Sequence, residues 1–196
     1  MGDISLVLGT EVTRDRQNKK LIISQENYTK SIIETFGTEN FKSASTPGYG
    51  PELFTKQPEE SFRNLEETQR HQAITGSVMN LAQITTFDIM YSTCQLARAI
   101  WRPSEVHMGA AEHFLKYLQI PTVFTLVYRK GGLTRTSLSD SNWGNNPDNG
   151  KSTSCCIMMF CKAPVGFGSG VQSLTALSAI EAELVEGVLA MREAVF

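Results

Sequence analysis

Residues 137 to 160 read SLSDSNWGNNPDNGKSTSCCIMMF. Two strand-like runs flank a loop rich in Asn, Pro and Gly, which is the pattern of two strands joined by a turn. Before Pro121 the apolar residues recur at spacings of three and four, and after it they recur at a spacing of two. This change of period predicts that a helical region ends near Pro121 and that a β-rich region follows.

Downstream of Pro121 the sequence predicts four strands, namely TVFTLVY (122–128), TRTSLSDSNW (134–143), TSCCIMMF (153–160) and APVGFGSGV (163–171). A helix is predicted over 175–195. Its apolar stripe comprises Ile180, Leu184, Val188, Met191 and Val195, with the small residues Gly187, Ala190 and Ala194 beside it. Because small residues permit close packing, we expect this helix to lie on the sheet.

Upstream, the β-rich runs 4–12 and 20–23 surround the polar stretch TRDRQNKK, which predicts a hairpin with a basic tip. Four helices are predicted next, over 24–37 and around three further stripes at helical spacing. The stripes are Ile74, Val78, Leu81; Met90, Cys94, Ala97, Trp101; and Met108, Ala111, Leu115, Leu118. The Pro-, Gly- and Ser-rich stretch 43–61 predicts a linker. The predicted fold is therefore α+β: a hairpin and helical bundle over 1–120, then an α/β module over 121–196.

Composition narrows the function classes. The chain has 196 residues, 41% hydrophobic, with a formal charge of −2. This length permits one sizeable core or two modest ones, and the charge provides no long-range attraction for polyanions. The four cysteines include no CxxC pair, which disfavours zinc and predicts buried free thiols. No run approaches the roughly 18 apolar residues of a spanning helix, and no signal-peptide pattern opens the chain. We therefore expect an intracellular chain, cytoplasmic or nuclear, without a membrane partner.

Asp140 stands inside a predicted strand, where it shares a face with Leu138 because side chains alternate. If Leu138 faces the final helix, Asp140 faces it too. Glu183 lies at the margin of that helix's apolar stripe, so the two carboxylates could converge and hold Mg²⁺. The alternative is that Asp140 caps the turn around residues 145–150 while Glu183 is a solvated helix residue. Spacing alone leaves both interpretations open.

The segment from SLSDSNWG to SAIEAELVEG resembles the start of the ribonuclease H domain of copia-type retrotransposon polyproteins, with the patterns S-D-x-x-W, K-S-T-S and E-A-E. Upstream, LVLGTEVTRD and LIISQENYTKSIIETFG are similar to the primer-grip hairpin and first thumb helix of the reverse transcriptase in those polyproteins. ASTPG, QAITGSVMNLAQITTFDIMYSTCQLARAI and HMGAAEHFLKYL follow in the same order. The resemblance covers nearly the whole chain. It implies a reverse transcriptase thumb region followed by the N-terminal half of a ribonuclease H domain.

The resemblance implies roles for individual residues. Asp140 matches the first catalytic aspartate of the family and Glu183 matches its glutamate, and both would hold the Mg²⁺ that cleavage of an RNA–DNA hybrid requires. The polymerase aspartates of the family would precede residue 1, and its other two ribonuclease H aspartates would follow Phe196. Glu186 and Glu193 are poor substitutes for these. We therefore expect a fragment that is inactive alone. The alternatives are a domesticated protein-interaction module and a ribonuclease H completed by another chain.

Two basic clusters lie where the resemblance implies contact with a template–primer or hybrid. The residues are Arg14, Arg16, Lys19 and Lys20 at the hairpin tip, and Arg98, Arg102, His107 and Lys116 in the helical region. The competing interpretation is a solvated surface. A ribonuclease H sheet normally continues past its first helix, so the first strand is expected to have an open edge. That edge predicts self-association or a partner chain that supplies strands.

Overall fold

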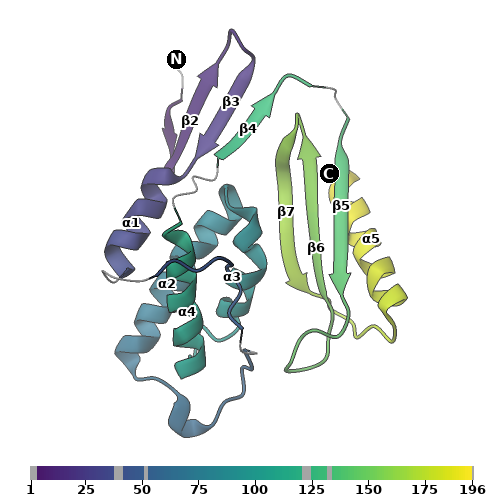
Figure 1. Cartoon of the computed structure of the whole chain (residues 1–196). Coiled ribbons are helices and arrows are strands. Elements are labelled where there is room, and N and C mark those ends of the chain that lie inside the picture. Colours follow the sequence, from purple (N-terminus) through teal and green to yellow (C-terminus); the bar gives the residue numbers. More distant parts are fainter. Residues whose placement is uncertain (1–3, 38–41, 51–52, 121–124, 132–133, 196) are drawn as a thin grey trace. The chain divides into compact units, whose positions relative to one another are not determined.

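The computed structural model describes residues 4–37, 42–50, 53–120, 125–131 and 134–195. The chain forms two compact units, Gln25–Phe124 and Met1–Ser24 together with Thr125–Phe196. Figure 1 labels their helices and strands.

The unit Gln25–Phe124 is helical. It contains α1 (Glu26–Phe36), α2 (Leu65–Ile84), α3 (Met90–Ala97) and α4 (Glu105–Leu118), with short 3-10 helices η1 (Glu59–Ser61) and η2 (Phe87–Ile89). The stripes predicted around Ile74 and Met108 are confirmed, because all their members are at most 8% exposed. The stripe predicted to end at Trp101 is only partly right. The helix ends at Ala97, and Trp101 is 85% exposed.

Polar side chains set the ends of these helices. Asn64 Oδ1 accepts a hydrogen bond from the Glu67 N–H at 2.9 Å and caps α2. Ser104 is the N-cap of α4, where Ser104 and His107 form a reciprocal capping box. On α1 the N-cap residue is Gln25.

The buried Gln25 side chain joins the start of α1 to the end of α2. Its Nε2 donates to Asn80 Oδ1 at 2.8 Å, and its Oε1 accepts from the Thr85 hydroxyl at 2.9 Å. The predicted linker is held against α4 by local contacts. The Ala44 N–H donates to the Lys116 carbonyl, and the Tyr49 and His113 rings lie 5.6 Å apart.

The other unit contains two antiparallel sheets. In the first, β1 (Leu6–Val7), β2 (Thr10–Asp15), β3 (Lys20–Ser24) and β4 (Thr125–Arg129) follow one another in that order. In the second, the order is β5 (Thr136–Asn142), β6 (Thr153–Phe160) and β7 (Ala163–Val171). The predicted hairpin and the four predicted downstream strands are therefore present.

The first downstream strand joins the hairpin. β4 pairs with β3 from Lys20↔Arg129 to Ser24↔Thr125, and this ladder groups residues 1–24 with the C-terminal segment. This division differs from the predicted one, which placed the hairpin with the helices. The predicted boundary at Pro121 lies outside the described residues. The Tyr128 hydroxyl donates to the Pro164 carbonyl at 2.5 Å and ties β4 to β7.

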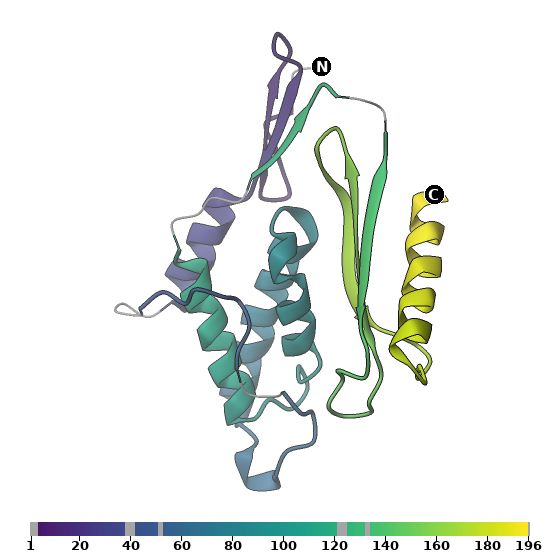
Figure 2. The same cartoon turned by 45° about the vertical axis from the view of Figure 1, so that its right-hand side comes forward.

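Helix α5 (Ala179–Val195) lies along one face of the β5–β6–β7 sheet (Figures 1 and 2). Figure 2 shows that sheet nearly edge-on, with α5 in yellow beside it. Helices and antiparallel sheets together confirm the predicted α+β class. Among the described residues, no helix combines the length and hydropathy needed to cross a bilayer.

Candidate functional site

The face that α5 turns toward the sheet is its small-residue face. Ala182, Glu186 and Ala190 are at most 5% exposed. The apolar stripe of α5 is 57–79% exposed, so the helix packs on the sheet through its small residues and not through this stripe. The sheet explains the difference. Small residues dominate the strand face beneath α5, where bulky side chains would find few apolar partners, and this face includes Ser139, Ser141, Ser154, Gly166, Gly168 and Gly170.

Hydrogen bonds of Gln172 identify which face of the sheet α5 covers. Its Nε2 donates to Ser154 Oγ and to the Ala182 carbonyl, both at 3.0 Å, so Ser154 points toward α5. Ser154 pairs with Ser141 across β5 and β6, and directly paired residues share a face. Asp140 pairs with Cys155, one position along, and alternation therefore places Asp140 on the opposite face.

Asp140 is therefore not beneath the helix, contrary to the expectation that it would face α5 with Leu138. Its side chain is exposed, and its Oδ1 accepts from the adjacent Ser141 N–H at 2.9 Å. The alternative, in which Asp140 caps the following turn, is also wrong. Asn145 and Asn146 hold that turn, through bonds to the Thr153 hydroxyl at 2.6 Å and the Asp148 N–H at 3.0 Å.

Glu183 is exposed, whereas Glu186 is only 2% exposed. Burial raises the pKa of the Glu186 carboxyl, a hydrogen bond with Ser154 opposes that rise, and the negative charges of Asp140 and Glu183 add to it. Glu186 Oε2 has no hydrogen-bond partner. The carboxyl that the fold brings against the strands is therefore Glu186, which sequence reasoning set aside. The Ala182–Glu186–Ala190 spacing of four could have pointed to it, because it places Glu186 in the middle of the small-residue face.

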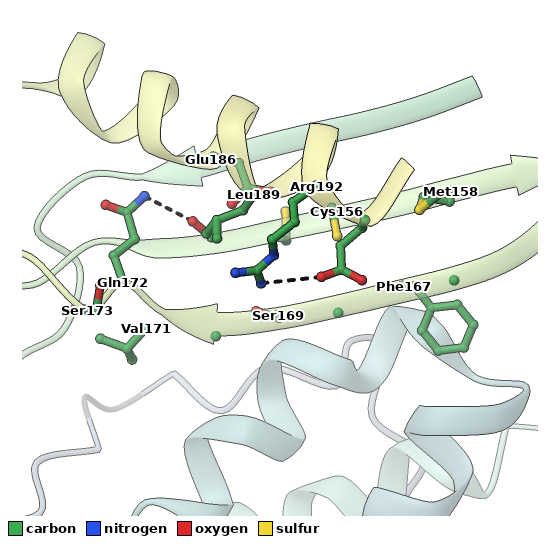
Figure 3. Close-up of a pocket in the computed structure, with 16 residues that line it drawn as sticks. Cys156, Met158, Phe167, Ser169, Val171, Gln172, Ser173, Glu186, Leu189 and Arg192 are labelled. Carbon is green, nitrogen blue, oxygen red and sulfur yellow. Dashed lines mark hydrogen bonds and ion pairs between the residues drawn. The ribbon is translucent and has the colours of Figure 1, made fainter. Parts of the chain in front are cut away.

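Glu186 lines a cleft of about 490 Å³ between α5 and β7 (Figure 3). Gly166, Gly168 and Gly170 contribute backbone alone to its lining, while Leu189 and Arg192 line it from α5. Burial also raises the pKa of the Cys156 thiol, with Glu186 and Glu193 contributing. These shifts favour the neutral acid and thiol. The cleft therefore holds one carboxyl whose ionisation the fold opposes.

The predicted Mg²⁺ ligands do not fit a preformed metal site. Asp140 lies on the face of the sheet away from α5, while Glu183 belongs to that helix. Over the described part of the chain, no group of three or more His, Cys, Asp or Glu residues is placed to hold a metal ion. The roles of Asp140 and Glu183 in catalysis and metal binding stay predictions.

The basic tip of the β2–β3 hairpin forms a second candidate site, called here the basic groove. It is a hollow of about 600 Å³ lined by the predicted Arg14, Arg16, Lys19 and Lys20 together with Arg129 and Lys130. Sequence reasoning missed Arg129 and Lys130, because they reach the hairpin only through the long-range β3–β4 pairing. The run YRKGG at 128–132 was the available signal.

One carboxylate lies in the basic groove. Asp15 accepts hydrogen bonds from the Asn18 backbone N–H at 2.9 Å and from the Asn18 side chain at 2.6 Å, and these bonds lower its pKa. Asp15 thus stays ionised in the physiological range and offsets one of the six cationic side chains that line the groove. The groove carries a local positive charge that the overall charge of −2 does not reveal.

The basic residues predicted in the helical unit have local partners. Arg102 Nη2 lies 2.6 Å from Glu59 Oε2, and its guanidinium stacks 4.0 Å from the Phe62 ring centroid. Arg98 donates to Gln95 Oε1 at 2.6 Å. Lys116 is half-buried on α4, and the His107 ring is buried in the capping box of that helix. These contacts give Arg102 and His107 structural roles. Contact of Arg98, Arg102 and Lys116 with nucleic acid stays a prediction.

Comparison with known proteins gives four relevant matches, three of them to transposon polyproteins. The chain is 28% identical over 189 residues to the retrovirus-related Pol polyprotein from transposon TNT 1-94 of Nicotiana tabacum, a match covering 94% of this chain and 14% of that protein. It is 27% identical over 183 residues to the corresponding polyprotein from transposon RE2 of Arabidopsis thaliana, covering 92% of this chain and 12% of that protein. The polyprotein from transposon RE1 of the same plant matches at 27% over 165 residues.

A shorter relative matches over a smaller region. The secreted RxLR effector protein 161 of Plasmopara viticola is 27% identical over 122 residues, which is 62% of this chain and 86% of that protein. No family model matches the chain, and no solved structure gives a significant match. The three polyprotein matches confirm the resemblance found in the sequence: the chain is a homologue of the copia-type, retrovirus-related Pol polyproteins of plant transposons, and it spans only about one seventh of their length or less.

Proposed function

We propose that this chain is the thumb region and first half of the ribonuclease H domain of a retrotransposon reverse transcriptase, that it binds an RNA–DNA hybrid or template–primer, and that it is inactive as a nuclease alone. The basic groove is the observation that carries the binding proposal. Six cationic side chains from β2, β3, β4 and the adjoining turns line one hollow there. Such a concentration of charge attracts a phosphate backbone without a need for a positive overall charge.

The nuclease part of the proposal rests on the arrangement of acids. Asp140 and Glu186 lie on opposite faces of the sheet, and Glu183 is exposed. Hydrolysis by two metal ions needs ligands that converge on one point. Mg²⁺ binding by Asp140 and Glu183 should therefore be weak. We expect hybrid cleavage near background in Mg²⁺ and in Mn²⁺. Robust cleavage that Asp140→Asn abolishes would contradict this and would favour a ribonuclease H completed by another chain.

The binding proposal is tested by fluorescence anisotropy with a labelled RNA–DNA hybrid at two salt concentrations. The double variant Lys19→Glu/Arg129→Glu should bind at least about tenfold more weakly. Its affinity should also depend less steeply on salt concentration, because fewer phosphate contacts release fewer counterions from the nucleic acid on binding. The control is Lys30→Glu on α1, where Lys30 is exposed and pairs with Glu26 at 2.8 Å. Equal affinities of the two variants would contradict the role of the basic groove.

A protein-interaction module is the second candidate. Its support is the edge position of β5 in the β5–β6–β7 sheet, together with the match to a protein named as a secreted effector. An edge strand presents unpaired backbone groups to a strand from a second copy or a partner chain. Absence of any salt-sensitive hybrid binding would favour this candidate over the first. In either case we expect the chain to act in the cytoplasm or nucleus.

A further inference from the structure

The outer face of α5 is apolar and uncovered within its own unit. Five side chains occupy it, each 57–79% exposed: Ile180, Leu184, Val188, Met191 and Val195. They lie on the side of the helix opposite Ala182, Glu186 and Ala190, which pack on the sheet. Soluble proteins rarely leave so continuous an apolar strip in water, and such strips mark interaction surfaces.

We propose that this outer face pairs with the same face of a second copy, so that two α5 helices lie antiparallel across a two-fold axis near Val188. The proposal goes beyond nucleic-acid binding and does not depend on it. It also differs from strand addition at β5, because α5 meets its partner through side chains and not through backbone groups.

The charges beside the strip favour an antiparallel second copy. Glu181 and Arg192 are eleven residues apart, about three turns, so they lie on the same flank of the helix. A two-fold axis through the middle of the strip brings Glu181 of one copy beside Arg192 of the other, and it does so twice. A parallel two-fold pairing would instead place these two flanks on opposite sides of the interface, so the contact between Glu181 and Arg192 would not form. The antiparallel arrangement also opposes the two helix dipoles favourably.

The area of the strip suits a modest dimer. Five side chains with these exposures leave on the order of 600 Å² per copy, compared with roughly 800 Å² per partner in a standard interface. Leu177, which is 86% exposed just before α5, extends the strip at one end. A dimer with a dissociation constant in the micromolar range is therefore expected, and strand addition is not needed to reach it.

Sedimentation velocity over a concentration series tests the proposal. The unaltered chain should show a reversible monomer–dimer equilibrium, and Leu184→Glu should be monomeric throughout. Val165→Glu, at a β7 residue that is 50% exposed, is the matched control and should dimerise normally. Arg192→Glu should weaken the dimer roughly tenfold because it places two carboxylates together twice. The swap Glu181→Arg/Arg192→Glu should restore it, an outcome that strand addition does not predict.

Oxidative cross-linking tests the geometry separately. In a Cys155→Ser background, Val188→Cys should form an intermolecular disulfide because the two copies of residue 188 lie beside the axis. Ile180→Cys should not, because residue 180 lies eight positions from the axis and its two copies would be about 24 Å apart along the helices. Circular dichroism should show unchanged folding for the substitutions at the exposed positions 180, 184, 188 and 192. Glu181 is half-buried and accepts a hydrogen bond from the Leu177 N–H at 2.7 Å, so the helix content of the swap variant must be checked before its dimerisation is compared. A monomer at every concentration, a dimer insensitive to Leu184→Glu, or cross-linking at residue 180 rather than 188 would overturn the proposal.

Discussion

The helical unit and the β5–β7 module with α5 bury different kinds of side chain. In the helical unit, large apolar residues such as Ile74, Phe114 and Leu115 are at most 1% exposed. In the module, the buried apolar residues are alanines, among them Ala163, Ala182 and Ala190, while the long apolar side chains of α5 face outward. The helical unit thus contains its own core. In the module, the long apolar side chains of α5 form part of the surface. This arrangement is expected of a part that packs against another protein surface.

The largest expected effect tests the core of the helical unit. Phe114→Ala on α4 should lower the free energy of unfolding by about 3–5 kcal/mol, because it leaves a cavity in close-packed surroundings. Leu138→Ala on β5, at a side chain 59% exposed, should cost less than about 1 kcal/mol. Urea denaturation followed by circular dichroism at 222 nm measures both. Equal losses of unfolding free energy in the two variants would contradict the conclusion that the helical unit contains its own core.

The same contrast explains what could be predicted from the sequence. Regular periods predicted β6 and β7 with their observed limits, and the stripes of α2 and α4 are buried as expected. In these elements local pattern and tertiary packing agree. On α5 they conflict, because the helix has an apolar face and a small-residue face. The choice between them depended on the Ser- and Gly-rich strand surface below.

Long-range pairing caused the other differences. The β3–β4 ladder joins residues more than one hundred positions apart, and no local signal specified it. For the same reason Arg129 and Lys130 were missed in the basic groove. The sequence pattern singled out Asp140 as a candidate site residue, but it did not specify the face of the sheet to which the side chain points. The register between β5 and β6 determines that face, and a slip of one residue would have reversed it.

A second prediction uses a titrating group inside the core of the helical unit. His71 on α2 is fully buried, and neither ring nitrogen has a hydrogen-bond partner. Burial, with a smaller contribution from His107, lowers the pKa of His71 from 6.5 to about 4. Below pH 6.5 the unfolded chain therefore binds a proton that the folded chain does not. The free energy of unfolding should fall by roughly 2–3 kcal/mol between pH 7 and pH 4 from this group.

The matched variant for this prediction is His71→Leu, which removes the titrating group and keeps the site filled. Its unfolding free energy should depend less on pH between 7 and 4 than that of the unaltered chain. At pH 7 it should be equal or somewhat higher, since no hydrogen bond is lost. An unchanged pH dependence would show that water reaches His71, and that the core of the helical unit is not closed around this side chain.

The smallest effect concerns the one buried acid of the module. Burial and the charges of Asp140 and Glu183 raise the pKa of Glu186 above its value in the unfolded chain. The protonated carboxyl therefore favours the folded state, and this contribution to the free energy of unfolding is lost as the pH rises through the pKa that Glu186 has in the folded chain. Glu186→Gln should therefore raise the free energy of unfolding at pH 7, by less than about 1 kcal/mol, and the gain should vanish near pH 4. Glu34→Gln, at an exposed position on α1, should change neither value. If Glu186→Gln instead destabilises the chain at pH 7, the ionised carboxylate must have a favourable partner in the cleft, because a buried charge without one cannot stabilise the fold. Repeating the measurement with added Mg²⁺ would then show whether that partner is a metal ion.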